Sequence, residues 1–360
     1  MTTQPSDPSS FNPFPPQFPN QFTPQFPLGA QPLAAGFRKD EAEESFLSEL
    51  NLRLAAAHDL ELIDQPERFP TLHVVGPPRS GTTLLMQLLA AHLDVGYINN
   101  LIAAFWRAPL YGIRLSRKLC PQAPESRFVS RYGRTEEITE PHEFGYFWKE
   151  LLGCSDLSEP IEGQLETIDW ERVRMLLTAM THEFGLPVVF KSFLVGWHAE
   201  RICHELSRTC VVQIRRDPAD TARSLYGMRK NYGGSIDTWT SLKPREYAWL
   251  KDEPVWDQLV GQVHFLERRF DREVAGVDPA RVLRVEYSRL CADPRGVLEE
   301  VRELLSGQMQ DGVEVNSRGT PPREFRLSRG GEISGEQSAL LSAALKRFGP
   351  DGDAGFREVA

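Results

Sequence analysis

Short apolar runs rich in branched residues recur along the chain and alternate with longer stretches of helical periodicity. The apolar runs lie at residues 71–75, 187–191, 210–214 and 281–285. The helical stretches lie at residues 84–89, 169–184, 198–206, 253–274 and 294–305. Strands that alternate with helices form a parallel sheet covered by helices on both faces. The pattern therefore predicts an α/β fold, in which a ligand lies across the carboxyl ends of the strands.

The first 36 residues do not follow this pattern. Residues 1–36 repeat phenylalanine, proline and glutamine, with few charges and no helical period. Prolines at this density exclude helices and interrupt strand ladders, so we expect a disordered tail. The repeated phenylalanines leave open a docking role, on the substrate pocket or on a partner, beside the simpler interpretation of an inert tail.

The segment after the first apolar run carries the clearest chemistry of the chain. Residues 71–84 read TLHVVGPPRSGTTL, where the apolar run ends at Gly76 and Gly81 precedes a helical run. In a strand, tight loop and helix of this kind, backbone N–H groups and the positive end of the helix dipole converge on an anion. The loop is therefore predicted to bind a phosphate or a related group.

This loop departs from that of nucleotide hydrolases in one position. A Walker loop reads G-x-x-x-x-G-K-[ST], and its lysine reaches the terminal phosphates. Gly76 and Gly81 have the required spacing, but Thr82 stands where the lysine should be. The fixed cation lies inside the loop instead, at Arg79. A kinase or ATPase without that lysine is not expected.

The loop instead resembles the 5′-phosphosulfate loop of sulfotransferases that use 3′-phosphoadenosine 5′-phosphosulfate (PAPS). Their loops read P-[KR]-S-G-T-T, and the segment that matches at every position is Pro78-Arg79-Ser80-Gly81-Thr82-Thr83. The resemblance implies that Arg79, with the amides and hydroxyls of residues 80–83, holds the 5′-phosphate and the sulfuryl group. It also implies a P-loop-type sheet and the product adenosine 3′,5′-bisphosphate.

A second motif, far along the chain, supports the first. Residues 209–226 read TCVVQIRRDPADTARSLY, so an apolar run is followed by Asp217, a helix N-cap residue, and Pro218, which suits a first helical turn. The sulfotransferase family binds the 3′-phosphate with an arginine at a strand end and a serine eight residues later. Arg216 and Ser224 match these positions. An arginine offers a planar fork to phosphate oxygens, and a serine adds a neutral donor.

Three further segments fit the resemblance. Residues 187–192 form an apolar run that ends in Lys191, which matches the family's lysine at the bridging oxygen and the leaving phosphate. Residues 282–295 resemble the family's strand-Tyr-x-x-Leu-x-x-x-Pro segment, which implies that Tyr287 lies near the adenosine. Residues 326–331 are a looser match to a basic cofactor loop, and a flexible surface loop is an equal alternative.

The catalytic base is not where the better-known branches place it. Transfer to a hydroxyl needs a base near the attacking oxygen and positive charge near the leaving phosphate. Cytosolic sulfotransferases have a histidine two residues after the lysine, where this chain has Phe193. Protein-tyrosine sulfotransferases have a glutamate after the phosphate loop, where this chain has Asn99 and Asn100.

The candidates for the base lie in residues 136–143, where four carboxylates and a histidine stand beside an aromatic run. Crowded carboxylates next to apolar surface raise the pKa of at least one of them, which suits a general base. Pro141 suits a first helical turn, so the candidates are expected near a helix start. We rank Glu140 and His142 first and Glu143 next. The alternative is an acidic helix N-terminus with a capping or core histidine.

The chain from residue 37 to 360 is expected to form one domain. An amphipathic helix at residues 40–60 should open it and pack on the core through one face, formed by Phe46, Leu47, Leu50 and Leu54. Residues 95–165 are irregular, aromatic and mixed in charge, and are expected to be a helical or irregular insertion that binds the acceptor. Five aromatic residues in it could line a pocket or belong to the core: Trp106, Tyr111, Tyr146, Phe147 and Trp148.

Composition narrows the function classes. A net charge of −9 argues against a nucleic-acid binder. The sequence has no apolar run long enough to cross a membrane and no basic, apolar secretory start. The five cysteines are scattered, odd in number and without metal-ligand spacing, so we expect reduced thiols, a cytoplasmic protein and no metal site.

Taken together, the sequence predicts a PAPS-dependent sulfotransferase that acts on a small-molecule, lipid or saccharide acceptor. Glycan polyanions would call for a more basic surface, so a small or lipid-like acceptor is favoured. Two alternatives stay open. One is a P-loop phosphotransferase that needs magnesium, for which Asp217 is the nearest candidate ligand. The other is a catalytically degenerate protein that binds nucleotide or a partner, in line with Phe193. The sequence does not indicate the oligomeric state.

Overall fold

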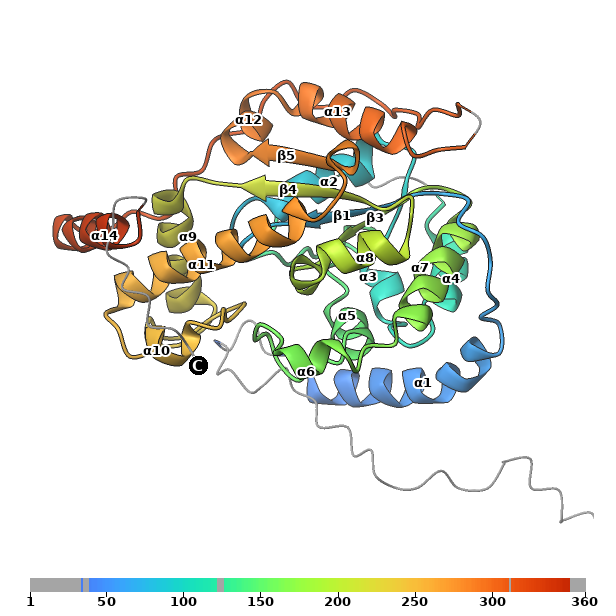
Figure 1. The fold of residues 1–360 in the computed structure, drawn as a ribbon, viewed down its shortest axis with the longest axis horizontal. Helices are drawn as coiled ribbons and strands as arrows, with labels where there is room; N and C mark the ends of the chain where they lie inside the picture. The colour runs from blue at the N-terminus through green and yellow to red at the C-terminus, as the bar shows by residue number, and fades with distance from the viewer. Residues whose placement is uncertain (1–33, 35–38, 122–125, 311, 350–360) are drawn as a thin grey trace, which may run out of the picture.

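A five-stranded parallel sheet forms the centre of the molecule. A computed structural model describes residues 34, 39–121, 126–310 and 312–349, so the predicted tail, Ala34 apart, lies outside the described residues. The strands lie in the order β2-β3-β1-β4-β5, and all neighbours are parallel (Figure 1). Their bounds are β1 Thr71–Val75, β2 Gly96–Tyr97, β3 Val188–Lys191, β4 Cys210–Arg215 and β5 Val282–Glu286. The predicted α/β fold is confirmed.

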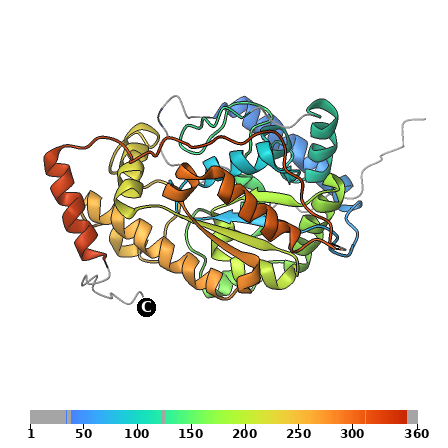
Figure 2. The ribbon, with the colours of Figure 1, turned by 90° about the horizontal axis from the view of Figure 1, so that it is seen from above.

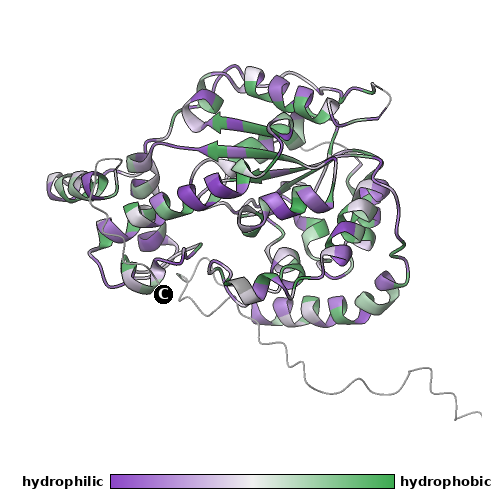
Figure 3. Ribbon diagram, viewed as in Figure 1, coloured by the Kyte–Doolittle hydropathy of each residue, from purple (hydrophilic) through white to green (hydrophobic). Residues whose placement is uncertain are grey.

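Helices cover both faces of the sheet, as Figures 1 and 2 show. One face carries α2 (Thr82–His92), α12 (Tyr287–Ala292) and α13 (Pro294–Ser306). The other carries α7 (Trp170–Phe184), α8 (Ala199–Glu205) and α11 (Val255–Ala275). Successive residues of a strand point to opposite faces, so Val74 packs with α2 and α13 while Val75 packs with the opposite layer. In Figure 3 the strands are accordingly mainly hydrophobic, whereas hydrophobic and hydrophilic residues alternate along the outer helices.

The other helices extend this frame. Between β2 and α7 lie α3 (Asn100–Ala103), α4 (Pro109–Leu119), α5 (Gly145–Leu151) and α6 (Glu162–Leu165). A 3₁₀ turn, η2 (Leu194–Trp197), follows β3. The helices α9 (Pro218–Asn231) and α10 (Tyr247–Leu250) follow β4. A second 3₁₀ turn, η3 (Pro279–Arg281), precedes β5, and α14 (Gly335–Arg347) packs on α9 and α11. Of the described helices, none has the length and apolar composition needed to cross a bilayer.

In the insertion, the helix expected near the candidate bases at residues 136–143 begins later than predicted. The helix expected to start at Pro141 starts instead at Gly145, after Phe144 in the left-handed region with φ 57°. Pro141 forms an isolated bridge with Asn99, and residues 142–144 are not helical. Three of the five aromatic residues belong to the core, because the exposed fractions of Trp106, Phe147 and Trp148 are 5%, 3% and 0%.

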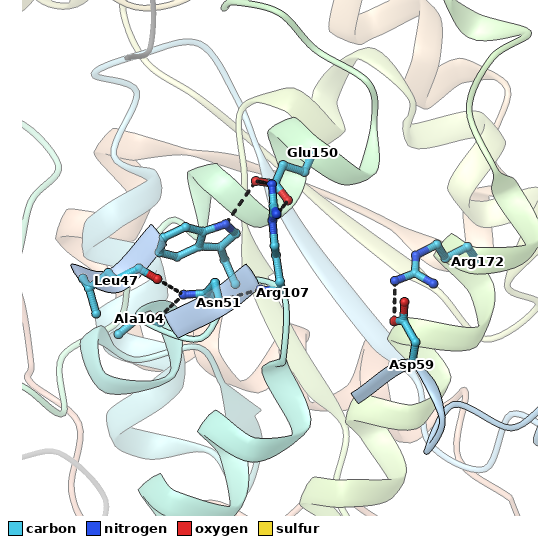
Figure 4. A network of polar contacts seen from close by, with 8 residues as sticks. Leu47, Asn51, Asp59, Ala104, Arg107, Glu150 and Arg172 are labelled. Atoms are coloured by element: carbon cyan, nitrogen blue, oxygen red, sulfur yellow. Dashed lines mark hydrogen bonds and ion pairs between the residues drawn. The ribbon is translucent and has the colours of Figure 1, made fainter. Parts of the chain in front are cut away.

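The first helix, α1 (Glu41–Asp59), is present as predicted, and Leu47 packs against the core as expected, but polar groups also hold the helix in place. Phe46, expected on the buried face, is 63% exposed, so that assignment was wrong. Figure 4 shows the contact that replaces it: Asn51 donates to the main-chain oxygens of Leu47 and Ala104 and accepts from the amide of Arg107. Asn51 lies one turn after Leu47 on the same face, and the hydrophobic pattern could not indicate it because its side chain is polar.

Candidate functional site

The predicted phosphate loop lies at the carboxyl end of β1, and its two glycines are required by close contacts. A Cβ at Gly76 would lie 2.4 Å from the main-chain oxygen of Ile214 in β4. A Cβ at Gly81 would lie 2.4 Å from a ring carbon of Tyr287, and Gly81 has φ 107°. The loop is thus held against the ends of β4 and β5. Pro78, Ser80 and Thr82 are buried, and Thr82 is the first residue of α2.

Arg79 joins the first motif to the second. Its backbone is left-handed, with φ 69°, and its Nε donates to the hydroxyl of Ser224 at 3.0 Å. Burial and then the charge of Arg216 lower the pKa of Arg79. Two motifs separated by more than a hundred residues therefore meet, and they place two guanidinium groups close together. Such a pair favours a bound anion, because the anion relieves the repulsion between like charges.

Arg216 lies at the end of β4 and links the loop to the C-terminal part of the chain. Its Nη1 donates to the main-chain oxygen of Arg79 at 2.9 Å, and its Nη2 donates to that of Ser328 at 2.7 Å. The guanidinium lies 4.7 Å from the centroid of the Tyr287 ring. The basic segment 326–331, a loose match in the sequence, is therefore packed against Arg216.

A cavity of about 520 Å³ opens beside these groups. Its walls include three arginines and three carboxylates, and they contain the 3′-phosphate candidate Arg216 and the adenosine candidate Tyr287, but not Ser224. Among the described residues, three buried donors in this region have no hydrogen-bond partner, namely Ser80 Oγ, Arg216 Nε and Arg223 Nε. Buried donors without a partner cost free energy unless a ligand or water accepts from them. The donor set fits a ligand with two anionic groups, as PAPS has.

Lys191 lies at the carboxyl end of β3, in the next strand of the sheet. Its side chain is 3% exposed, and its Nζ lies 3.4 Å from Oε2 of Glu143 and 5.2 Å from the centroid of the Phe193 ring. Oε1 of Glu143 is buried without a partner among the described residues. The structure thus brings one of the three candidate bases, Glu143, next to the predicted leaving-group lysine.

The other two candidates have different surroundings. Glu140 is 5% exposed, and its Oε2 accepts from Nε2 of Gln87 on α2 at 3.0 Å. That carboxylate holds the insertion on α2, a role that the spacing of acidic residues could not indicate.

The ring of His142 is accessible to water but has protein around it, as a group in an open cleft does. Burial and then the charge of Lys191 lower the pKa of His142, which keeps the ring neutral near pH 7. Its Nδ1 accepts from the amide of Phe144 at 2.8 Å. This hydrogen bond assigns the ring proton to Nε2. In that tautomer Nε2 is a donor and cannot accept a proton.

One part of the site was not indicated by the sequence. The segment Arg131–Arg134 forms a tight turn whose tip lies against the phosphate loop. A Cβ at Gly133 would lie 3.7 Å from both Lys191 Nζ and Thr83 Oγ1, and the Tyr132 ring lies 5.4 Å from the guanidinium of Arg79. The signal for such a turn is usually Asn-Gly or Asp-Gly, and Tyr-Gly between two arginines does not resemble it.

The chain was compared with protein families, solved structures and curated proteins. A family model described as "Sulfotransferase family" matches residues 70–311. Among solved structures, sulfotransferase STF9 from Mycobacterium avium is 15% identical with a TM-score of 0.47, over 88% of this chain and 78% of that chain. Sulfotransferase STF1 from Mycobacterium tuberculosis H37Rv is 16% identical with a TM-score of 0.43, over 77% and 79%. A sulfotransferase from Alicyclobacillus acidocaldarius is 16% identical with a TM-score of 0.39, over 79% and 95%. No curated protein matches the sequence.

Proposed function

The chain belongs to the sulfotransferase family, and we propose that it transfers a sulfuryl group from PAPS to a hydroxyl of a small-molecule, lipid or saccharide acceptor. The observation that carries the proposal is the contact between the two phosphate motifs. Arg79 donates to Ser224, and Arg216 donates to the main-chain oxygen of Arg79. A loop that holds a 5′-phosphosulfate and a pair that holds a 3′-phosphate must be this close to bind one nucleotide.

Each group then has a defined task. The amides at the start of α2, with Arg79, Ser80 and Thr83, bind the 5′-phosphosulfate, because the helix dipole and the guanidinium both favour negative charge. Arg216 and Ser224 bind the 3′-phosphate, and Tyr287 packs near the adenosine. Lys191 lies close to Thr83, so its ammonium stabilises the charge that develops on the leaving phosphate oxygen.

We assign the general base to Glu143. A base must lie within reach of the proton that it removes, and Oε2 of Glu143 lies 3.4 Å from Lys191 Nζ. Glu140 is buried against Gln87, and the exposed nitrogen of His142 already carries a proton. In the proposed step the acceptor oxygen bonds to sulfur, the bond from sulfur to the bridging oxygen breaks, and Glu143 takes the hydroxyl proton.

The same proposal places the enzyme in the cytoplasm. The five cysteines are all free thiols, and three of them are buried. A reducing compartment keeps cysteines in this state.

Calorimetric titration with adenosine 3′,5′-bisphosphate, without magnesium, tests the donor. We expect tight binding that Arg216→Ala abolishes, because an arginine–phosphate pair is lost. Arg215→Ala is the matched control, since Arg215 has the neighbouring position but pairs with Asp271 on α11. It should bind as the wild type does. A preference for ATP with magnesium, or equal loss in both variants, would contradict the proposal and favour the phosphotransferase alternative.

A further inference from the structure

The turn Arg131–Arg134 has a geometry that its sequence does not favour. Arg131 and Arg134 exchange both main-chain hydrogen bonds, at 2.9 and 3.1 Å. The two central residues, Tyr132 and Gly133, both have positive φ, at 53° and 86°. Two successive positive φ values define a type I′ turn, which costs little at glycine but is unfavourable for tyrosine. A strained tyrosine persists where contacts of its side chain hold it in place.

The contacts of Tyr132 bind the turn to the donor side of the site. Its ring lies 5.4 Å from the guanidinium of Arg79, and its hydroxyl accepts from Nδ2 of Asn231 at 2.9 Å. The same hydroxyl reaches the main-chain oxygen of Gly227 at 3.5 Å. Asn231 and Gly227 lie on α9, the helix that also carries Ser224. The ring therefore spans from the phosphate loop to the helix of the second motif.

Gly133 lies over the space between the loop and the lysine. A Cβ at this position would lie 3.7 Å from Lys191 Nζ and 3.7 Å from Thr83 Oγ1. Under the proposed function these atoms hold the leaving phosphate and the sulfuryl group. The turn thus covers the reacting group with a residue that has no side chain, while Tyr132 covers Arg79.

We propose that this turn excludes water from the sulfuryl group and so makes the enzyme select an acceptor hydroxyl over water. The inference rests on the proposed function. The competing reaction is hydrolysis: a water oxygen bonds to sulfur, the bond from sulfur to the bridging oxygen breaks, and a water proton is released. Its products are sulfate and adenosine 3′,5′-bisphosphate. Exclusion of water from a closed site suppresses such side reactions.

Release of adenosine 3′,5′-bisphosphate from PAPS without any acceptor measures the hydrolysis. Tyr132→Asn is the informative variant, because Asn-Gly is a preferred type I′ sequence and keeps the backbone of the turn, while the ring that holds the turn against Arg79 and α9 is removed. We expect hydrolysis to rise by about tenfold, which corresponds to about 1.4 kcal/mol in the barrier. Tyr132→Phe is the matched control. It keeps the ring beside Arg79 but loses the hydroxyl bonds to Asn231 and Gly227, so it should raise PAPS hydrolysis less than Tyr132→Asn does.

Calorimetry with adenosine 3′,5′-bisphosphate on the same variants separates this inference from the proposed function. If the wild type binds the bisphosphate but Tyr132→Asn hydrolyses PAPS no faster, the covering role is wrong and the donor assignment stands. If Tyr132→Phe hydrolyses as fast as Tyr132→Asn, the ring is not the cover, which also overturns the inference. If the wild type does not bind the bisphosphate, the proposed function fails and this inference fails with it.

Discussion

Single atoms decide between the three acidic and basic candidates at residues 140–143. All three have the composition of a general base, yet each has a different partner. The partner of Glu140 is an amide, that of His142 is a main-chain N–H, and that of Glu143 is the ammonium of Lys191. The donor that each carboxylate accepts from, and the tautomer of the histidine ring, depend on the fold around these side chains. The sequence predicted the segment, whereas the ranking of the candidates within it depends on contacts that only the fold supplies.

The base assignment predicts unequal effects of three conservative variants. Glu143→Gln keeps the size of the side chain but removes the proton acceptor, so transfer to an added alcohol acceptor should fall by about 10²- to 10⁴-fold. His142→Gln and Glu140→Gln should retain most of the activity if they fold. Turnover is measured as bisphosphate release that depends on the acceptor, and binding of the bisphosphate by calorimetry confirms that each site is intact. Full activity of Glu143→Gln would remove it from the mechanism.

Among the strands, the sequence predicted only those that are long enough to form an apolar run. β1, β3, β4 and β5 each match a run in the sequence, whereas β2 has two residues and leaves no period. The helix start at Pro141 was wrong because Pro141 instead forms a bridge with Asn99. Tertiary contacts decided both cases, and neither contact has a local signal. The strand ends at Arg79, Lys191 and Arg216 converge because parallel strands share one carboxyl edge.

The polar docking of α1 predicts a specific sensitivity at Asn51. This side chain is fully buried and makes three hydrogen bonds, which join α1 to the segment around Ala104 and Arg107. Asn51→Leu would leave the main-chain oxygen of Ala104 and the amide of Arg107 buried without their partner. Each such group costs about 1–3 kcal/mol.

Urea unfolding measures this loss as a lower midpoint. Arg53→Ala is the matched control, because Arg53 lies on the same helix and makes an exposed pair with Glu49. An exposed pair of this kind contributes little, so the midpoint should change little. If the two variants unfold at the same urea concentration, Asn51 does not hold the helix in place.

For the whole molecule, buried titratable groups set how stability depends on pH. His73 lies in β1 at 0% exposure, stacked 5.3 Å from Phe190, and burial lowers the pKa of its ring to about 3. Burial likewise lowers the pKa of His198 to about 4. Glu267 acts in the opposite sense, since burial raises the pKa of its carboxyl to about 7. The folded state therefore holds neutral histidines and a partly protonated glutamate near neutral pH.

The signs of these shifts predict that the protein loses stability on mild acidification. An unfolded histidine has a pKa of about 6.5 and binds a proton that folded His73 and His198 do not. Their contribution is complete above that pH and is lost as the pH falls toward the folded values. Glu267 gains stability over part of the same interval, but two histidines outweigh one carboxyl. The melting temperature should therefore fall between pH 7 and pH 5.

His73→Phe isolates the largest of these contributions. Neither ring nitrogen of His73 has a hydrogen-bond partner among the described residues, and an aromatic ring already stacks on it, so phenylalanine can replace it without an orphaned group. The fall in melting temperature between pH 7 and pH 5 should become smaller in this variant. His204→Gln is the control, because the His204 side chain is 76% exposed and should leave the pH dependence unchanged. The same fall in His73→Phe as in the wild type would show that acid sensitivity comes from other groups.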